Sequence, residues 1–270
     1  KKYTAYHVHT ELSLLDSCTN YKLYVDKAVE LGQKALAFTE HGNIYQWVEK
    51  KMYCDAKGIK YLHGIECYLT ETHEPNPETG SKVRDNYHTI LIAKNYAGVL
   101  ELNKLVSIST TDSHTYYKPR ISFDEFLGTS KNIIKISACL ASPLNKLPFS
   151  HKRYMELARH YDELDRLAAF YDYFEIQPHD FQEQKDFNLH LAQLSRELGK
   201  PLIAGTDTHS IDKYKAECRS ILLAAKHIEY SDEDSFDLTY KSYDELVEMF
   251  RKQNVLPESL YLDAIENTNR

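Results

Sequence analysis

Runs of apolar residues alternate with amphipathic stretches along the chain and predict strands and helices that take turns. Seven short apolar runs are typical of strands, at 3–8, 35–39, 61–69, 87–93, 133–137, 173–177 and 201–204. Apolar residues recur at helical spacing between them, over 21–32, 45–58, 96–107, 153–170 and 183–198. A sustained β-α order predicts an α/β fold with a parallel sheet and helices outside it.

Polar residues gather at the ends of these predicted strands. His7 and His9 close the first strand, and Asp207 and His209 follow the last one. Strand residues two apart point the same way, so each pair shares a face. Polar groups in or just beyond the other strands are Asp16, His41, Glu66, His88 and Cys139. Because a (β/α) barrel holds its active site at the carboxyl ends of its strands, we expect one shared site there.

The chemistry of these side chains favours a cluster of metal ions. Nine potential ligands exceed what one tetrahedral zinc needs, so they predict two or three divalent ions bridged by carboxylates. Imidazole and thiolate favour zinc, whereas carboxylates also suit manganese or iron. Metal ions about 3.5–4 Å apart catalyse in-line attack at phosphorus through a metal-bound hydroxide.

Several of these residues also have an ordinary structural interpretation. His88 and Glu66 are compatible with hydrogen-bonded polar groups at strand ends. Cys139 is compatible with a plain buried thiol, because free cysteine often behaves as a small core residue. Asp16 lies in a loop and is compatible with a cap on the following helix.

Three further residues are candidates for substrate contacts. His179 follows the sixth strand at the rim of the predicted site. Arg120 and Lys94 are cations that suit a phosphate group, although most lysines and arginines are solvated surface residues.

Composition limits the classes of protein that fit. The chain has 270 residues, of which 42% are hydrophobic and 27% charged, which fits one large globular domain or two small ones. Its net charge of −7 argues against extended non-specific duplex binding by this chain alone. No apolar run approaches the roughly 18 residues of a membrane span. The five scattered cysteines, with no C-x-x-C pair, predict reduced thiols and a cytoplasmic location.

The ordered motifs resemble one known superfamily. The segments His7–Thr10, Thr39–Asn43, Gly64–Tyr68, Tyr87–Asn95 and Asp207–His209 resemble those of the PHP (polymerase and histidinol phosphatase) superfamily. Three segments are closer to the N-terminal PHP domains of bacterial DNA polymerase III alpha subunits, namely Ser13–Asp16, Tyr116–Arg120 and Ser137–Leu140. The resemblance covers roughly residues 3–250.

The resemblance implies a distorted (β/α)7 barrel with a trinuclear site. It implies that the first metal is held by His7, His9, Glu66 and Asp207. Glu66 would bridge to a second metal, held also by His88 and Cys139, and Asp16, His41 and His209 would hold the third. The whole chain, 1–270, would be a single PHP domain, with the barrel over about 3–225 and a C-terminal helical appendage over about 226–270.

The implied activity is that of a metal-dependent phosphoesterase, with Glu66, Asp207 and His209 as its catalytic residues. The first expectation is a 3′-5′ exonuclease of the proofreading type, which acts on a DNA 3′ end and has the rest of a DNA polymerase as partner. A phosphomonoesterase for a phosphorylated small molecule and a non-catalytic, metal-stabilised docking module of a polymerase are the alternatives.

Two departures from the family pattern stand out. Glu40 replaces the aspartate that usually precedes the motif histidine, and a longer carboxylate beside a ligand can alter metal preference. The segment Gly205–His209 is more similar to stand-alone phosphatases than to the polymerase form.

Overall fold

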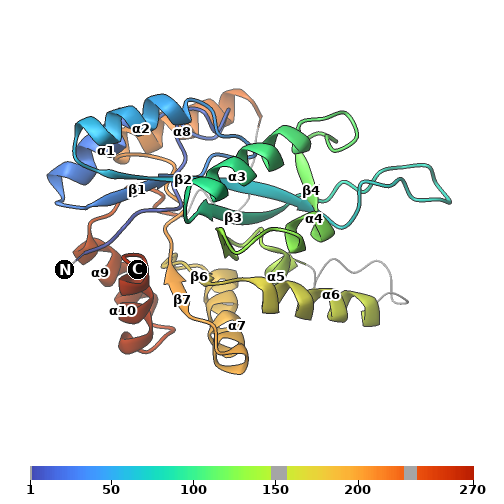
Figure 1. Ribbon diagram of the computed structural model, residues 1–270. Coiled ribbons are helices and arrows are strands. Elements are labelled where there is room, and N and C mark those ends of the chain that lie inside the picture. Colours follow the sequence, from blue (N-terminus) through green and yellow to red (C-terminus); the bar gives the residue numbers. More distant parts are fainter. Residues whose placement is uncertain (1, 147–156, 228–235) are drawn as a thin grey trace.

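The computed structural model describes residues 2–146, 157–227 and 236–270, and two β-sheets form its centre (Figure 1). One sheet has five strands, β1 (Ala35–Phe38), β2 (Lys60–Thr70), β3 (Tyr87–Ala93), β4 (Arg120–Ser122) and β5 (Ile133–Ile136). The other pairs β6 (Phe174–Ile176) with β7 (Leu202–Ala204). The protein is therefore α/β, as expected from the alternating pattern.

Strand directions in the larger sheet are mixed, which corrects the predicted parallel sheet. β2 runs parallel to β1 and β4, but β3 runs antiparallel to both β2 and β5. No helix separates β2 from β3 in the sequence, so the chain returns directly alongside β2 instead of crossing over. His88 therefore pairs with Tyr68 and faces the end of the sheet where β2 finishes.

The predicted strand 3–8 is wrong in extent. Among the described residues, that segment forms only two isolated bridges, Ala5 to Leu36 of β1 and Val8 to Thr208 beyond β7. The segment crosses from one sheet to the other and pairs with each at a single residue. A further bridge, Ile136 to Tyr173, joins β5 to the residue before β6. Single bridges thus link the two sheets on both sides.

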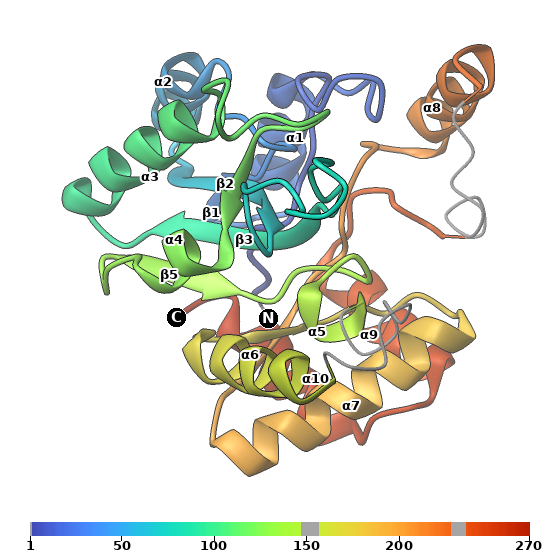
Figure 2. The ribbon, with the colours of Figure 1, turned by 90° about the vertical axis from the view of Figure 1, so that its right-hand side faces the viewer.

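Ten helices lie in the described part of the chain. They are α1 (Tyr21–Glu30), α2 (Trp47–Ala56), α3 (Tyr96–Ser109), α4 (Phe123–Leu127), α5 (Pro143–Lys146), α6 (Leu157–Phe170), α7 (Gln182–Leu198), α8 (Lys213–Ala225), α9 (Tyr243–Gln253) and α10 (Glu258–Asn267). Side-chain caps begin several of them, for example Asn20 for α1 and Asp212 for α8. The start predicted for α6, at 153–156, lies outside the described residues. Figure 2 shows α1, α2 and α3 beside the larger sheet and α6, α7, α9 and α10 around the smaller one.

The last two helices, expected as an appendage, are built into the main core. Leu246, Phe250, Tyr261 and Ile265 belong to the same buried cluster as the strand residues. The Asn267 side chain donates a 2.7 Å hydrogen bond to the Leu202 carbonyl of β7. Among the helices described, none is both long and apolar enough to cross a membrane.

Candidate metal centre

Four side chains meet where the N-terminal segment, β2 and the loop after β7 come together. His7 Nε2 lies 3.0 Å from Asp207 Oδ1 and 3.3 Å from Glu66 Oε1. His9 Nε2 lies 3.3 Å from the same Asp207 oxygen and 3.5 Å from Glu66 Oε2. The two histidines and Glu66 are almost fully buried. The structure thus brings together the four residues that the resemblance implies for a first metal.

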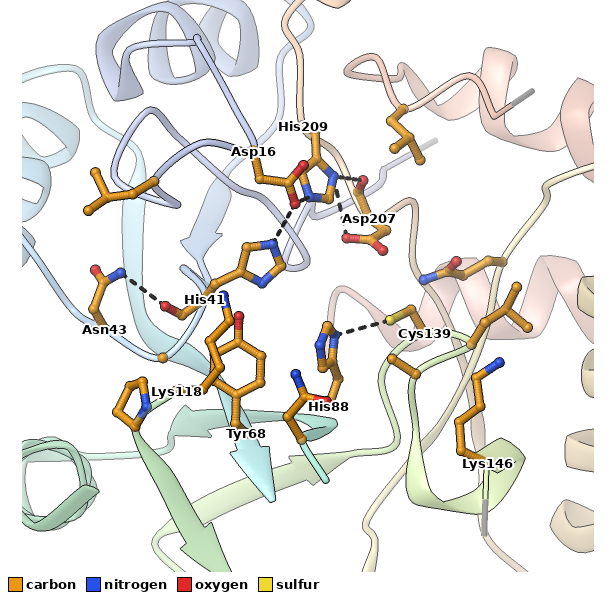
Figure 3. Close-up of a pocket in the computed structure, with 18 of the residues that line it drawn as sticks. Asp16, His41, Asn43, Tyr68, His88, Lys118, Cys139, Lys146, Asp207 and His209 are labelled. Carbon is orange, nitrogen blue, oxygen red and sulfur yellow. Dashed lines mark hydrogen bonds and ion pairs between the residues drawn. The ribbon is translucent and has the colours of Figure 1, made fainter. Parts of the chain in front are cut away.

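Glu66 also faces two ligands on its other side. His88 Nδ1 lies 3.0 Å from Glu66 Oε1. Cys139 Sγ lies 3.5 Å from His88 Nδ1 and 3.9 Å from the Glu66 oxygen. Figure 3 shows His88 and Cys139 pointing toward one another. These three residues are the set expected around a second metal. The backbone turns just before Cys139, where Ala138 adopts a φ of 60°.

Asp16 gathers the third set. Its Oδ2 lies 2.8 Å from His41 Nε2 and 3.1 Å from His209 Nε2 (Figure 3). The other ring nitrogen of His41, Nδ1, lies 2.5 Å from Glu66 Oε2. All nine predicted ligands therefore form one continuous cluster with Glu66 at its centre.

The buried polar atoms of this cluster fit metal ions. Six of them make no hydrogen bond within the described part of the chain, namely His7 Nε2, His9 Nε2, His41 Nδ1, Glu66 Oε2, Asp207 Oδ1 and His209 Nε2. They face other atoms of the cluster at distances of 2.5–3.6 Å instead. Divalent cations coordinate such imidazole nitrogens and carboxylate oxygens, so the cluster fits metal ions.

Hydrogen bonds at the opposite ring nitrogens direct three imidazoles toward the cluster. His7 Nδ1 donates to Glu175 Oε1 at 2.7 Å, and His209 Nδ1 donates to the Asp207 carbonyl at 2.7 Å. His9 Nδ1 donates to Ser13 Oγ at 2.9 Å. An N–H at Nδ1 leaves the lone pair on Nε2, the nitrogen that faces the carboxylates, free to bind a metal.

Neighbouring charges shift the pKa values of the carboxylates and imidazoles in this cluster. Burial raises the pKa of Glu66, but His88 and His41 outweigh it and hold that pKa well below its ordinary value. Burial lowers the pKa of His41, but Glu66 and Asp16 outweigh it and raise that pKa to about 10. His9, buried between His41 and His209, has its pKa lowered to about 3.

Glu175 supports this site and was missed by the sequence analysis. It is fully buried in β6 and accepts hydrogen bonds from Tyr6 Oη at 2.8 Å and Gln177 Nε2 at 2.6 Å, besides the one from His7. A Cβ on Gly205 would lie 2.4 Å from the Glu175 carboxyl carbon, so glycine is needed there. The signal available in the sequence was a carboxylate between two apolar strand residues.

Glu40, the departure from the family pattern, also lies beneath the ligands. Ser13 Oγ, the acceptor for His9, donates to Glu40 Oε2 at 2.6 Å. Lys50 Nζ of α2 donates to Glu40 Oε1 at 2.6 Å and is itself buried. Burial opposes ionisation, but Lys50 and His9 hold the pKa of Glu40 at about 2. The Glu40 carboxylate therefore orients His9 through Ser13.

Arg219 of α8 holds Asp16 from behind the cluster. Its Nη2 donates to Asp16 Oδ1 at 2.5 Å and its Nε donates to the Asp16 carbonyl at 2.6 Å. The other carboxylate oxygen of Asp16 faces His41 and His209. A helix that the pattern analysis did not predict thus positions one of the expected ligands.

A cavity of about 550 Å³ opens over the cluster. Asp16, His41, His88, Cys139, Asp207 and His209 all line it, and so do two cations, Lys118 and Lys146 (Figure 3). Lys118 Nζ lies over the ring of Tyr68, 5.3 Å from its centroid. The sequence analysis did not select either lysine.

The three residues predicted to contact substrate do not line this cavity. Lys94 follows the distal end of antiparallel β3 and is exposed. Arg120 is buried and its Nη1 donates to the carbonyls of Val83 and Asp85 at 2.8 and 2.9 Å. The ring of His179 is buried and stacks on Phe236 with centroids 4.7 Å apart. Antiparallel β3 leaves Lys94 at the end of the strand away from the cluster, and the Arg120 guanidinium holds the loop after β2.

Comparison with known proteins identifies the family. Residues 5–179 match the PHP domain, and the chain belongs to that family. It is 33% identical over 272 residues to DNA polymerase III subunit alpha of Borreliella burgdorferi, which covers 98% of this chain and 23% of that protein. It is 33% identical over 218 residues to the same subunit of Treponema pallidum, covering 80% of this chain and 18% of that protein. The chain thus spans less than a quarter of these relatives.

Solved structures give more distant likenesses. A two-domain protein of Bacteroides vulgatus that contains a predicted PHP-like metal-dependent phosphoesterase aligns with a TM-score of 0.43 and 13% identity, over 93% of this chain and 69% of that one. Histidinol phosphate phosphatase of Lactococcus lactis, complexed with zinc, L-histidinol and phosphate, aligns with a TM-score of 0.38 and 14% identity, over 85% of this chain and 95% of that one. At these TM-scores neither likeness carries an argument about the site.

Proposed function

We propose that the chain is a metal-dependent 3′-5′ exonuclease that hydrolyses DNA phosphodiesters, as the PHP domain of a replicative DNA polymerase or a stand-alone relative. The observation that supports this most is the convergence of nine potential ligands around Glu66, in a chain related to polymerase alpha subunits. The cytoplasm is the proposed location, and a DNA 3′ end and the rest of a polymerase are the proposed partners.

The proposed ligands form three sets, of which the first two share Glu66, with zinc as the first choice of metal and manganese or iron as alternatives. The first ion would be held by His7, His9, Glu66 and Asp207, the second by Glu66, His88 and Cys139, and the third by Asp16, His41 and His209. When bound, such ions would supply Lewis acidity and a water of lowered pKa near neutral pH.

The residues of the chain provide position and charge for this reaction. Glu66 places one oxygen toward His7 and His88 and the other toward His9 and His41, so it fixes the spacing of the sets. Asp207 and His209 follow β7 and join the first set to the third. Lys118 offers positive charge to a phosphate in the cavity, whereas the ammonium of Lys146 is paired with Glu183 at 2.8 Å.

The single bridges between the sheets support a distorted (β/α)7 barrel as the architecture. The N-terminal segment bridges to β1 on one side and to the end of β7 on the other, while β5 bridges toward β6. We take residues 1–270 as one PHP domain, because helices α9 and α10 share its core.

The test is digestion of a single-stranded DNA labelled at its 3′ end, in the presence of zinc or manganese. Release of labelled mononucleotides is expected from the wild-type chain, with a loss of about 100-fold or more in Asp207→Ala because a ligand of the first ion is removed. The exposed-residue variant Glu197→Gln serves as a matched control. Release that survives both Asp207→Ala and His9→Ala would contradict the proposal.

A small-molecule phosphomonoesterase is the second candidate. The cavity of about 550 Å³ is the observation that favours it, since small-ligand pockets span about 300–1,000 Å³. Faster hydrolysis of p-nitrophenyl phosphate than of its bis ester would select this reading. If no ester is hydrolysed with any metal while chelation lowers the melting temperature, the chain is instead a metal-stabilised docking module.

A further inference from the structure

A second group of metal-binding side chains lies outside this centre. His73 comes from the loop after β2, His114 from the loop after α3, and Glu125 from α4 (Figure 1). His73 Nε2 lies 3.1 Å from Glu125 Oε2, and His114 Nε2 lies 2.8 Å from Glu125 Oε1. One ligand atom from each residue lies within 4.8 Å of the others.

We propose that His73, His114 and Glu125 bind a divalent transition metal ion, with zinc as the best match. Two imidazole nitrogens and a carboxylate oxygen are a ligand set that zinc accepts, with its fourth position left to water. The arrangement repeats the pattern of the main centre, where ring nitrogens also converge on a shared carboxylate.

The contacts of the other ring nitrogen of His114 are compatible with metal binding at its Nε2. His114 Nδ1 contacts Thr111 Oγ1 at 3.0 Å and Ser113 Oγ at 2.9 Å, and an Nδ1–H donated there leaves the Nε2 lone pair for the ion. His73 Nδ1 is buried and makes no hydrogen bond to any described residue.

The charge balance around the group is compatible with an added cation. Glu125 supplies one negative charge and also accepts from the Ser122 amide at 2.7 Å, which fixes its carboxylate. The nearby guanidinium of Arg120 lies 3.0 Å from Asp85 Oδ1, so its charge is paired. The ion would therefore face one carboxylate and two imidazoles.

A metal at this position would link two loops that line the cavity over the main metal centre. The loop after β2 and the loop after α3 carry His73 and His114, and the same two connections supply Asn86, Thr110, Lys118 and Pro119 to the cavity lining. Crosslinking two long loops through an ion restricts their movement relative to each other. The role of this site is thus structural, and it does not depend on the activity proposed for the main centre.

The test is zinc content after equilibrium dialysis of the full chain against zinc and then against metal-free buffer. The variant His73→Gln/His114→Gln is expected to hold one zinc fewer per chain than the wild type. His190→Gln, which changes an exposed histidine of α7, is the matched control and is expected to keep the wild-type content. Unchanged zinc in the double variant would overturn the proposal.

A second variant covers the case in which the double variant misfolds. Glu125→Gln keeps an acceptor oxygen for the Ser122 amide and so preserves the cap of α4, while it removes the ligand charge. It is expected to lose the same zinc and to keep the circular dichroism spectrum of the wild type. Asp207→Ala, which damages only the main centre, is expected to retain this zinc. If Glu125→Gln keeps full zinc content, or Asp207→Ala retains none, the site does not exist.

Discussion

Beneath His9, a chain of hydrogen bonds from Ser13 to Glu40 to Lys50 ends in a buried ammonium group. A buried ion pair contributes little net stability, but removal of one partner leaves an uncompensated charge. The Glu40–Lys50 pair holds Ser13 Oγ, which accepts from His9 Nδ1 and so sets the tautomer of His9. The pair therefore orients a ligand in addition to any effect on stability.

Lys50→Met is expected to lower the free energy of unfolding by about 3–5 kcal/mol, because the Glu40 carboxylate is left buried without its cation. The double variant Glu40→Gln/Lys50→Met removes both charges and is expected to recover most of that loss. Urea unfolding of the two variants and the wild type measures the difference. Equal destabilisation by the single and double changes would show that packing, and not charge, explains the effect.

Acid should remove the contribution of the same pair. The pKa of Glu40 is about 2 in the folded chain, against an ordinary value of 4.5. A depressed folded pKa gives stability that is present above the unfolded value and is lost as pH falls through the folded one. The advantage of the wild type over Glu40→Gln/Lys50→Met in urea should therefore stay level above pH 4.5 and shrink below it. An advantage that grows toward low pH would contradict this.

At the level of elements, the sequence was informative where a pattern was local. Helices α1, α2, α3 and α7 follow from apolar periodicity, and the ligands at strand ends follow from two-residue spacing. The direction of β3 was mispredicted because strand pairing is set by long-range contacts that periodicity does not contain. The N-terminal segment forms one single-residue bridge on the side of each sheet. A run of apolar residues does not show how many of its residues will pair. Lys118 and Lys146 were missed because surface lysines have no distinguishing pattern.

Helix α8 supports the third set of ligands through Arg219, and this role is testable. Arg219→Met keeps much of the side-chain volume but frees Asp16, so zinc affinity at that set is expected to fall about 10–100-fold, as for other residues that support a ligand. Tyr214→Ala, at an exposed position of the same helix, is the control. Competition with a zinc-binding dye measures the affinities. If both variants bind zinc as the wild type does, α8 has no part in holding Asp16.

For the whole molecule, the cluster lies where the two sheets meet. Glu66 and His88 belong to the larger sheet, whereas Asp207 and His209 follow a strand of the smaller one. Ions bound by residues from both sheets would connect the two sheets, in addition to the single β-bridges and the common hydrophobic core.

Chelation is therefore expected to lower the melting temperature of the whole chain. A ligand present at about 1,000 times its dissociation constant stabilises by about 4 kcal/mol. Differential scanning calorimetry with and without a chelator measures the loss, and re-addition of zinc should restore the transition. A variant lacking a ligand of the first ion, Asp207→Ala, should respond less to the chelator. An identical response would place the stabilising metal elsewhere.

The raised pKa values of His7 and His41 mean that these two imidazoles hold protons near neutral pH when no ion is bound. Asp207 and Glu175 outweigh burial to raise the pKa of His7, and Glu66 and Asp16 do the same for His41, to about 10. An ion can bind these nitrogens only when their protons leave. Loading the site near neutral pH should thus acidify an unbuffered solution, and the heat of zinc binding should vary with the ionisation enthalpy of the buffer. Zinc affinity should rise with pH, so that local acidity would act as a competitor for the metal.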